Sequence, residues 1–158
     1  GIIIENGSAR LDYAQVRYGY YNLLVNNTAV TNSVHLQNSQ FHSAAMAGLG
    51  VAGGVVTAVC SSFSNNDGSG VWVWDTSIPI VDISSSSFVG NGDAGLRNEN
   101  AAQVDARNNW WGDASGPAGI GSGTGDAVSG NVLFAPWQME ETCTTQTYQL
   151  YLPGVVKS

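Results

Sequence analysis

One short frame of residues recurs five times in this chain and constrains the fold more than any other feature. The frame is an apolar residue, a second apolar residue two positions later, and an aromatic residue five positions after that; Val81, Ile83 and Phe88 form its clearest copy. The copies begin at Leu11, Val34, Val56, Val81 and Val104 and end at Tyr18, Phe41, Phe63, Phe88 and Trp111. The aromatic residue therefore recurs at steps of 23, 22, 25 and 23 residues. A period in the low twenties is typical of solenoids, in which each repeat forms one coil of a stack.

The frame predicts an all-β solenoid of about five coils of 22–25 residues, which covers residues 1–111. Alternate side chains of a strand point to opposite faces, so the two apolar residues of each frame point inward. The aromatic residue then returns to the core after a polar turn. In the first coil this register places Leu11, Tyr13 and Tyr18 inside. The residues three positions before the aromatics are interpreted as a stacked hydrogen-bonding ladder: Gln15, Asn38, Cys60, Ser85 and Asn108.

The amino-acid composition limits the kinds of molecule that the protein could bind. Only 11% of the 158 residues are charged, and the formal net charge is −7. Nucleic-acid binding needs a basic stripe, so the sequence predicts no nucleic-acid partner. No apolar run approaches the length of a membrane span. The chain begins at Gly1 without an initiator methionine or a signal peptide, so we expect a processed or trimmed piece of a longer protein.

Both ends of the chain depart from the repeat. The first strand resembles the end of a coil whose earlier part is missing, and residues 112–137, rich in glycine, are predicted to cap the last coil. Residues 138–158 are predicted to form an extended apolar tail that docks on the solenoid or on a neighbouring subunit. An open coil and a β-prone tail both offer strand edges to a second copy. The candidate assembly residues are Ile2, Ile4, Tyr148, Leu150 and Leu152.

The closing part of the coils resembles a known family. The run from Asp105 to Pro117, DARNNWWGDASGP, with Gly125-Asp126 and Pro136-Trp137 after it, is similar to the C-terminal cap of secreted bacterial β-helix surface proteins. The coil frame with its asparagine-rich corners resembles right-handed parallel β-helix proteins of the pectate-lyase-like superfold. The tail resembles terminal segments that follow such caps in filamentous phototrophic bacteria. The resemblance implies a right-handed parallel β-helix and an extracellular or cell-surface location, but one fold hosts many functions.

The resemblance implies that enzymes with this fold act on polysaccharides. Some of them catalyse an elimination with a Ca²⁺ ion that clustered acidic side chains hold. The matching column here is the outward position between the paired apolar residues: Asp12, His35, Thr57, Asp82 and Asp105. Neighbouring coils lie about 4.8 Å apart, so Asp82 and Asp105 are expected to be adjacent. Either Arg107 or a Ca²⁺ ion would relieve their repulsion. We predict no catalytic residue and no obligatory cofactor, and Asp82 and Asp105 are the candidate ligands if calcium binds.

Trp72 and Trp74 are the candidate binding residues. If Val71 and Val73 point inward, both tryptophans point outward together. Neighbouring exposed tryptophans indicate a contact with a sugar, with the tail or with another subunit.

Cys60 and Cys143 allow one disulfide, which would fix the tail to the side of the third coil. The alternative is two free thiols, which a reducing compartment would enforce.

Two functions stay open at this point. The first is a non-enzymatic extracellular structural protein, a homo-oligomer that assembles end to end into a filament or a cell-surface fibre; its simpler version is one domain of a larger surface protein. The alternative is a polysaccharide-binding module or a Ca-dependent polysaccharide lyase of the same superfold.

Overall fold

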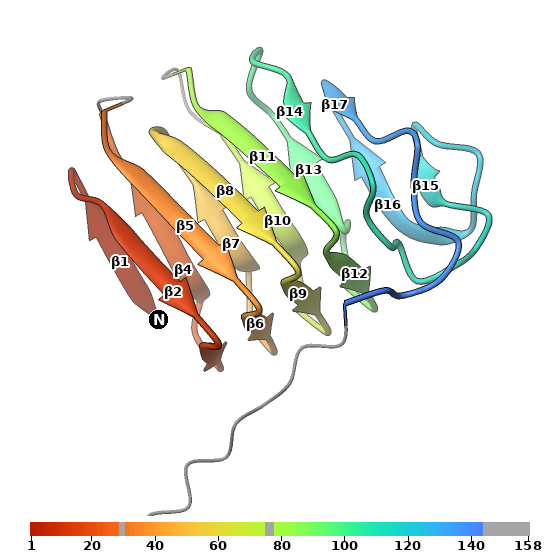
Figure 1. The fold of residues 1–158 in the computed structure, drawn as a ribbon, viewed down its shortest axis with the longest axis horizontal. Coiled ribbons are helices and arrows are strands. Elements are labelled where there is room, and N and C mark those ends of the chain that lie inside the picture. Colours follow the sequence, from red (N-terminus) through yellow and green to blue (C-terminus); the bar gives the residue numbers. More distant parts are fainter. Residues whose placement is uncertain (29–30, 75–77, 144–158) are drawn as a thin grey trace, which may run out of the picture.

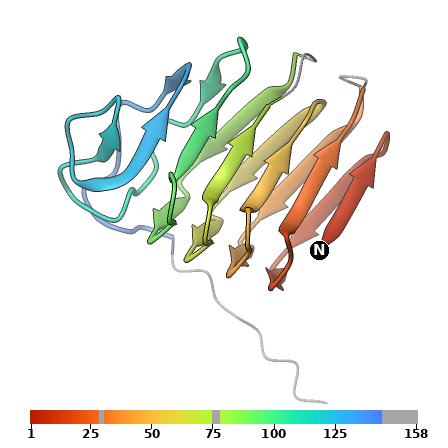
Figure 2. The ribbon, with the colours of Figure 1, turned by 180° about the vertical axis from the view of Figure 1, so that it is seen from behind.

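The computed structural model describes residues 1–28, 31–74 and 78–143, and it shows a parallel β-solenoid of about five turns (Figure 1). Each complete turn adds one strand to each of three sheets, which run along the stack and are visible from the opposite side in Figure 2. Within the described ranges no helix has the length and apolar character that a bilayer crossing requires.

The three sheets differ in length. Sheet A has the order β1-β4-β7-β10-β13-β16-β15, sheet B the order β17-β14-β11-β8-β5-β2, and sheet C the order β12-β9-β6-β3. The strands of sheet A are β1 (Ile2–Glu5), β4 (Tyr21–Asn26), β7 (Ala47–Val51), β10 (Ser69–Val73), β13 (Leu96–Asn98), β15 (Pro117–Gly119) and β16 (Gly125–Ser129). Those of sheet B are β2 (Ala9–Asp12), β5 (Ser33–Gln37), β8 (Val55–Val59), β11 (Ile80–Ser84), β14 (Val104–Asp105) and β17 (Val132–Leu133). Those of sheet C are β3 (Gln15–Arg17), β6 (Gln40–His42), β9 (Ser62–Ser64) and β12 (Ser87–Val89).

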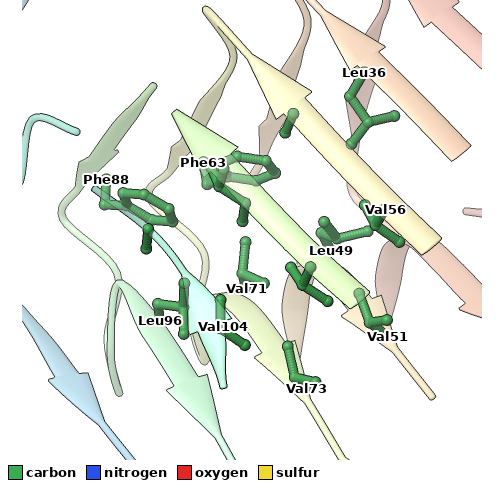
Figure 3. Close-up of a cluster of buried hydrophobic side chains, with 14 of the residues drawn as sticks. Leu36, Leu49, Val51, Val56, Phe63, Val71, Val73, Phe88, Leu96 and Val104 are labelled. Carbon is green, nitrogen blue, oxygen red and sulfur yellow. The ribbon is translucent and has the colours of Figure 1, made fainter. Parts of the chain in front are cut away.

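The core consists of files of identical or similar side chains that run along the solenoid axis. From the second coil onward, the frame residues of the sequence lie where the repeat predicts, with Val56 beside Val34 and Val81, and Phe63 beside Phe41 and Phe88. The aromatic rings stack at centroid distances of 5.5, 5.4 and 4.4 Å along the file Phe41, Phe63, Phe88 and Trp111. Sheet A supplies the facing files, which begin with Leu23 and Val25, and Figure 3 shows both sets of side chains meeting inside the coils. Full burial of each such ring is worth about 2–3 kcal/mol, so the stack carries much of the stability.

In the first coil, the observed register differs from the predicted register by two residues. Ala9, Leu11 and Val16 pair with Val34, Leu36 and Phe41. Tyr13 and Tyr18, which were predicted to lie inside, are 53% and 75% exposed. Both triplets have the spacing of the frame, so the spacing alone does not choose between them. The structure turns the triplet without hydroxyl groups toward the core, against which Leu11 and Val16 pack partly buried, because a tyrosine hydroxyl inside an apolar file would lack a hydrogen-bond partner.

The predicted polar ladder is displaced by one position. Four of the five residues predicted to form it occupy the left-handed region of the backbone at the corner between sheets B and C, with φ between 49° and 58° at Asn38, Cys60, Ser85 and Asn108. The fifth, Gln15, lies in β3, because the first coil is displaced by two residues. The buried ladder consists of the residues that follow them: Ser39, Ser61, Ser86 and Asn109. Each side-chain oxygen accepts a hydrogen bond from the backbone N–H of the coil before it, at 2.8–3.3 Å. These bonds satisfy the backbone donors of a buried corner.

The interval predicted as a cap, residues 112–137, extends two of the three sheets. β16 pairs with β13, and β17 pairs with β14, so Val128 and Val132 join the core files. β15 then pairs with β16 as the outermost strand of sheet A. Most of the predicted tail, including the three assembly candidates Tyr148, Leu150 and Leu152, lies outside the described residues.

Candidate functional site

The outer face of sheet A carries a group of apolar and aromatic side chains. Strand pairing aligns one outward residue from each successive coil along this face: Ile3, Leu24, Gly50, Trp72, Arg97 and Ser129. Val71 and Val73, which flank Trp72, are fully buried, so Trp72 points away from the core as the alternation predicts. Trp74 follows β10 directly and lies beside Trp72, with ring centroids 4.8 Å apart.

Gly50 makes room for this group. A β-carbon at Gly50 would lie 2.9 Å from the rings of both Trp74 and Tyr21, which is too close for any side chain. The two rings therefore fill the place of the missing side chain, and their centroids lie 5.5 Å apart at an interplanar angle of 23°. Tyr21 comes from the second coil and Trp74 follows the fourth, so the rings bridge the third coil. Burial, and then the neighbouring Tyr20, raise the pKa of the Tyr21 hydroxyl.

We call Ile3, Tyr21, Leu24, Trp72 and Trp74 the aromatic strip. Its end nearest β1 is hollowed into an apolar depression of about 260 Å³, lined by Gly1, Ile3, Tyr20, Tyr21 and Leu24. Ile3 and Tyr20 are 63% and 61% exposed, whereas Tyr21, Leu24 and both tryptophans are half-buried. The strip is thus a continuous apolar surface that is partly open to solvent.

An ionic cluster borders the strip at its other end. The indole Nε1 of Trp72 donates a hydrogen bond of 3.0 Å to Glu99, and the guanidinium of Arg97 lies 5.3 Å from the ring centre of Trp72. Arg97 also donates at 3.0 Å to Glu99 through Nε and at 3.0 Å to Asp93 through Nη1. The hydrogen bonds from Arg97, and then that from Trp72, hold the pKa of the Glu99 carboxyl below its ordinary value. The cluster therefore fixes the orientation of Trp72.

The second candidate group, Asp82 and Asp105, lies on sheet B. The two residues pair directly between β11 and β14, in a file that continues through Thr57 and His35 to Arg10. Asp12 was predicted to belong to this file, but it pairs with Gln37, because the first coil is displaced by two residues. Its side chain instead accepts a hydrogen bond of 2.7 Å from Arg10.

Arg107 forms an ion pair with one member of the acidic pair, Asp105. It donates to Asp105 through Nη2 at 2.6 Å and through Nε at 3.0 Å. These bonds hold the pKa of the Asp105 carboxyl below its ordinary value. In the part of the chain that the structure describes, no three His, Cys, Asp or Glu side chains gather as a metal site. Asp82 and Asp105 as calcium ligands therefore stay a prediction.

The remaining candidate residues are the two cysteines and the isoleucines of the first strand. Cys60, at the corner between β8 and β9, forms a disulfide with Cys143, with Cα atoms 5.2 Å apart. Ile2 is 40% exposed on β1, and Ile4 packs against the end of the core.

The sequence correctly placed Trp72 and Trp74 on the outer face, but it did not predict the residues that contact them. Tyr21 and Glu99 come from coils on either side of β10, and only the coil-to-coil register brings them together. The signal for Gly50 was present: it is the outward residue of β7, at the place where the neighbouring coils carry Leu24 and Trp72.

Comparison with known proteins agrees with the geometry. A family model described as "Right handed beta helix region" matches residues 1–136. The chain belongs to this right-handed β-helix family. Comparisons with curated proteins and with solved structures gave no match. The family membership accounts for the parallel pairing and the stacked files, but the β-helix by itself assigns no activity.

Proposed function

We propose that this β-helix is a non-enzymatic extracellular protein that binds polysaccharide on the outer face of sheet A. The observation that carries the proposal is the aromatic strip, in which Tyr21, Trp72 and Trp74 are held together over Gly50. Ligand sites are mostly apolar surfaces with a few fixed polar groups. The strip has this composition, because Glu99 and Asp93 border it.

The shape of the strip suits a polymer. Its residues come from successive coils spaced about 4.8 Å apart, so the distance from Ile3 to Trp72 across three coil steps is about 14 Å. A sugar presents apolar C–H faces to an aromatic ring and hydroxyl groups at its edge. Tryptophan and tyrosine offer rigid apolar area with few rotatable bonds, which limits the entropy that binding loses.

The disulfide supports the extracellular location. Disulfides persist in oxidising compartments and are rare in the cytosol. The link between Cys60 and Cys143 ties the segment after the last strand to the third coil. In a secreted protein it would hold this segment on the solenoid surface.

The test is affinity electrophoresis of the purified chain through gels that contain one soluble polysaccharide each, with a panel of neutral and acidic polymers. We expect retardation by at least one polymer, and the Trp72→Ala/Trp74→Ala double variant should weaken it about tenfold or more. Tyr18→Ala is the matched control, since Tyr18 is exposed and lies off the strip. Far-UV circular dichroism should show the same fold for all three proteins. Equal retardation of the double variant and the native chain would contradict the proposal.

End-to-end assembly is a second candidate, and the described end of the solenoid favours it. β1, β2 and β3 each have one edge that no described strand pairs. Ile4, Leu11 and Val16 continue the core files there and are only partly buried. An unpaired edge with apolar side chains favours pairing with another chain. Sedimentation velocity over a hundredfold concentration range tests this candidate, since a monomer at every concentration would contradict it.

A further inference from the structure

We propose that the aromatic strip selects uncharged polysaccharides and rejects polyuronates, in which every sugar carries a carboxylate. This inference rests on the proposed carbohydrate-binding function. It follows from the charges at the strip and from the partners that these charges already have.

Arg97 is the described basic side chain that touches the strip, and three of its five N–H donors are engaged by carboxylates. Asp93 accepts from Nη1, and Glu99 accepts from both Nε and Nη2. The central carbon of its guanidinium lies over the ring of Trp72, 5.3 Å from the ring centre. One positive charge thus stands against two negative charges, and the cluster is net negative. A ligand carboxylate that approached the remaining N–H groups of Arg97 would bring a third negative charge beside one positive charge, and Asp93 and Glu99 would repel it.

The remaining described arginines lie on other faces. Arg10 on β2 pairs with Asp12, and Arg107 beyond β14 pairs with Asp105. Arg17 on β3 lies against the ring of Tyr18. The chain as a whole has 5 basic and 12 acidic residues, so its long-range field also repels a polyanion.

The cluster is suited to hydroxyl groups instead. An ionised carboxylate accepts hydrogen bonds and donates none, and each has about four acceptor positions. The side chains of Asp93 and Glu99 are 50% and 43% exposed, so acceptor positions face the solvent beside Trp72. A neutral sugar that stacks on the strip would donate its hydroxyl protons to them, and hydrogen bonds to charged acceptors are the stronger kind.

Within the described residues, the strip carries no preformed calcium site that a polyuronate could share. A bridging ion needs several oxygen ligands, and the described residues contain no group of three acidic, His or Cys side chains. The adjacent pair Asp82 and Asp105 lies on sheet B, away from the strip.

The experiment compares the retardation of the chain by a neutral β-glucan, a neutral mannan, a polygalacturonate and an alginate at low ionic strength. The amino group of Gly1 borders the hollow, so it is acetylated to remove its charge. We expect at least one neutral polymer to bind about tenfold or more tightly than either polyuronate, with dependence on Trp72. The Asp93→Asn/Glu99→Gln variant, which frees Arg97, should gain binding to polyuronate. The matched control is Asp105→Asn, which frees Arg107 on sheet B and should gain none that depends on Trp72.

The outcomes separate the two claims. Trp72-dependent binding of a polyuronate as tight as that of the neutral polymers would overturn this inference and leave the proposed function standing. Binding of no polymer, or binding that ignores Trp72, would overturn both. Self-association that Trp72→Ala abolishes would make the strip a contact between copies of the chain, and would also overturn both.

Discussion

The stacked aromatic file and the corrected register of the first coil can be tested with one pair of substitutions. Phe63 and Tyr18 occupy the same position in the sequence frame, but Phe63 is fully buried and Tyr18 is 75% exposed. If the repeat alone decided burial, Phe63→Ala and Tyr18→Ala would be similarly destabilising. The structure predicts that they differ by several kcal/mol.

The magnitudes follow from what each ring contacts. Removal of a buried phenyl ring costs about 3–5 kcal/mol in transfer and cavity terms. Phe63 also stacks on Phe41 and Phe88 at 5.5 and 5.4 Å, so its replacement removes two ring pairs and we expect about 4–5 kcal/mol. Tyr18 meets the guanidinium of Arg17 at 5.3 Å and the ring of His42 at 6.5 Å. Such an exposed cation–π contact is worth about 0.5–1 kcal/mol, which bounds the effect of Tyr18→Ala.

The assay is urea unfolding of the oxidised chain, followed by far-UV circular dichroism. The midpoint of Phe63→Ala should fall strongly, whereas that of Tyr18→Ala should stay close to the midpoint of the native chain. Equal losses for both variants would refute the assigned register of the first coil. A mild effect of Phe63→Ala would refute the stacked file itself.

Three further predictions concern the disulfide and the aromatic strip. The disulfide closes a loop with a sequence separation of 83, so Cys60→Ser/Cys143→Ser should lower the free energy of unfolding by up to about 4–5 kcal/mol; an unchanged urea midpoint would contradict this. Gly50→Val should displace the rings that lie 2.9 Å from its new β-carbon, which near-UV circular dichroism would detect while the far-UV spectrum stays native; an unaltered near-UV spectrum would argue against the assigned ring positions. The hydrogen bonds from Arg97 and then from Trp72 lower the pKa of Glu99, so its carboxylate is ionised at neutral pH and accepts the bond from Trp72. The stability that this bond contributes is lost as pH falls through the lowered pKa. The indole N–H resonance of Trp72 should shift in that acidic range, and Glu99→Gln should remove the titration.

The sequence repeat predicts most of the fold because a solenoid coil has one inward pattern that every turn must satisfy. Val56, Phe63 and their equivalents had to be apolar to stack, so their spacing identified the coils. The predicted register of the first coil was wrong because both Val16 and Tyr18 satisfy the spacing of the frame. Which of the two points inward depends on the tyrosine hydroxyl. Similarly, the corner ladder was displaced by one residue, because Asn38 and Ser39 are both polar and only the backbone conformation separates their roles.

The strip was harder to predict, because its contacts join different coils at a lateral offset. Trp72 and Trp74 followed from alternation within one strand. Their partners depend on which residue of the neighbouring coil stands beside them, and loops of unequal length between the strands alter that register. Glu99, for example, lies 27 positions from Trp72, although the frame advances by only 22–25 residues per coil.

The three faces of the solenoid use their outward positions differently, and this difference supports the proposal that sheet A binds the ligand. At the corner of sheets B and C, one turn position of each coil points inward and forms the buried ladder, and Cys60 forms the disulfide. On sheet B, Arg107 forms an ion pair with Asp105, which is one of the two adjacent acids. On sheet A, by contrast, the chain places large rings over a glycine, although a single side chain at Gly50 would have filled the same space. Aromatic surface kept half-exposed in this way is costly in water and contributes little to the core, so a ligand that covers it is the simplest physical reason for its presence.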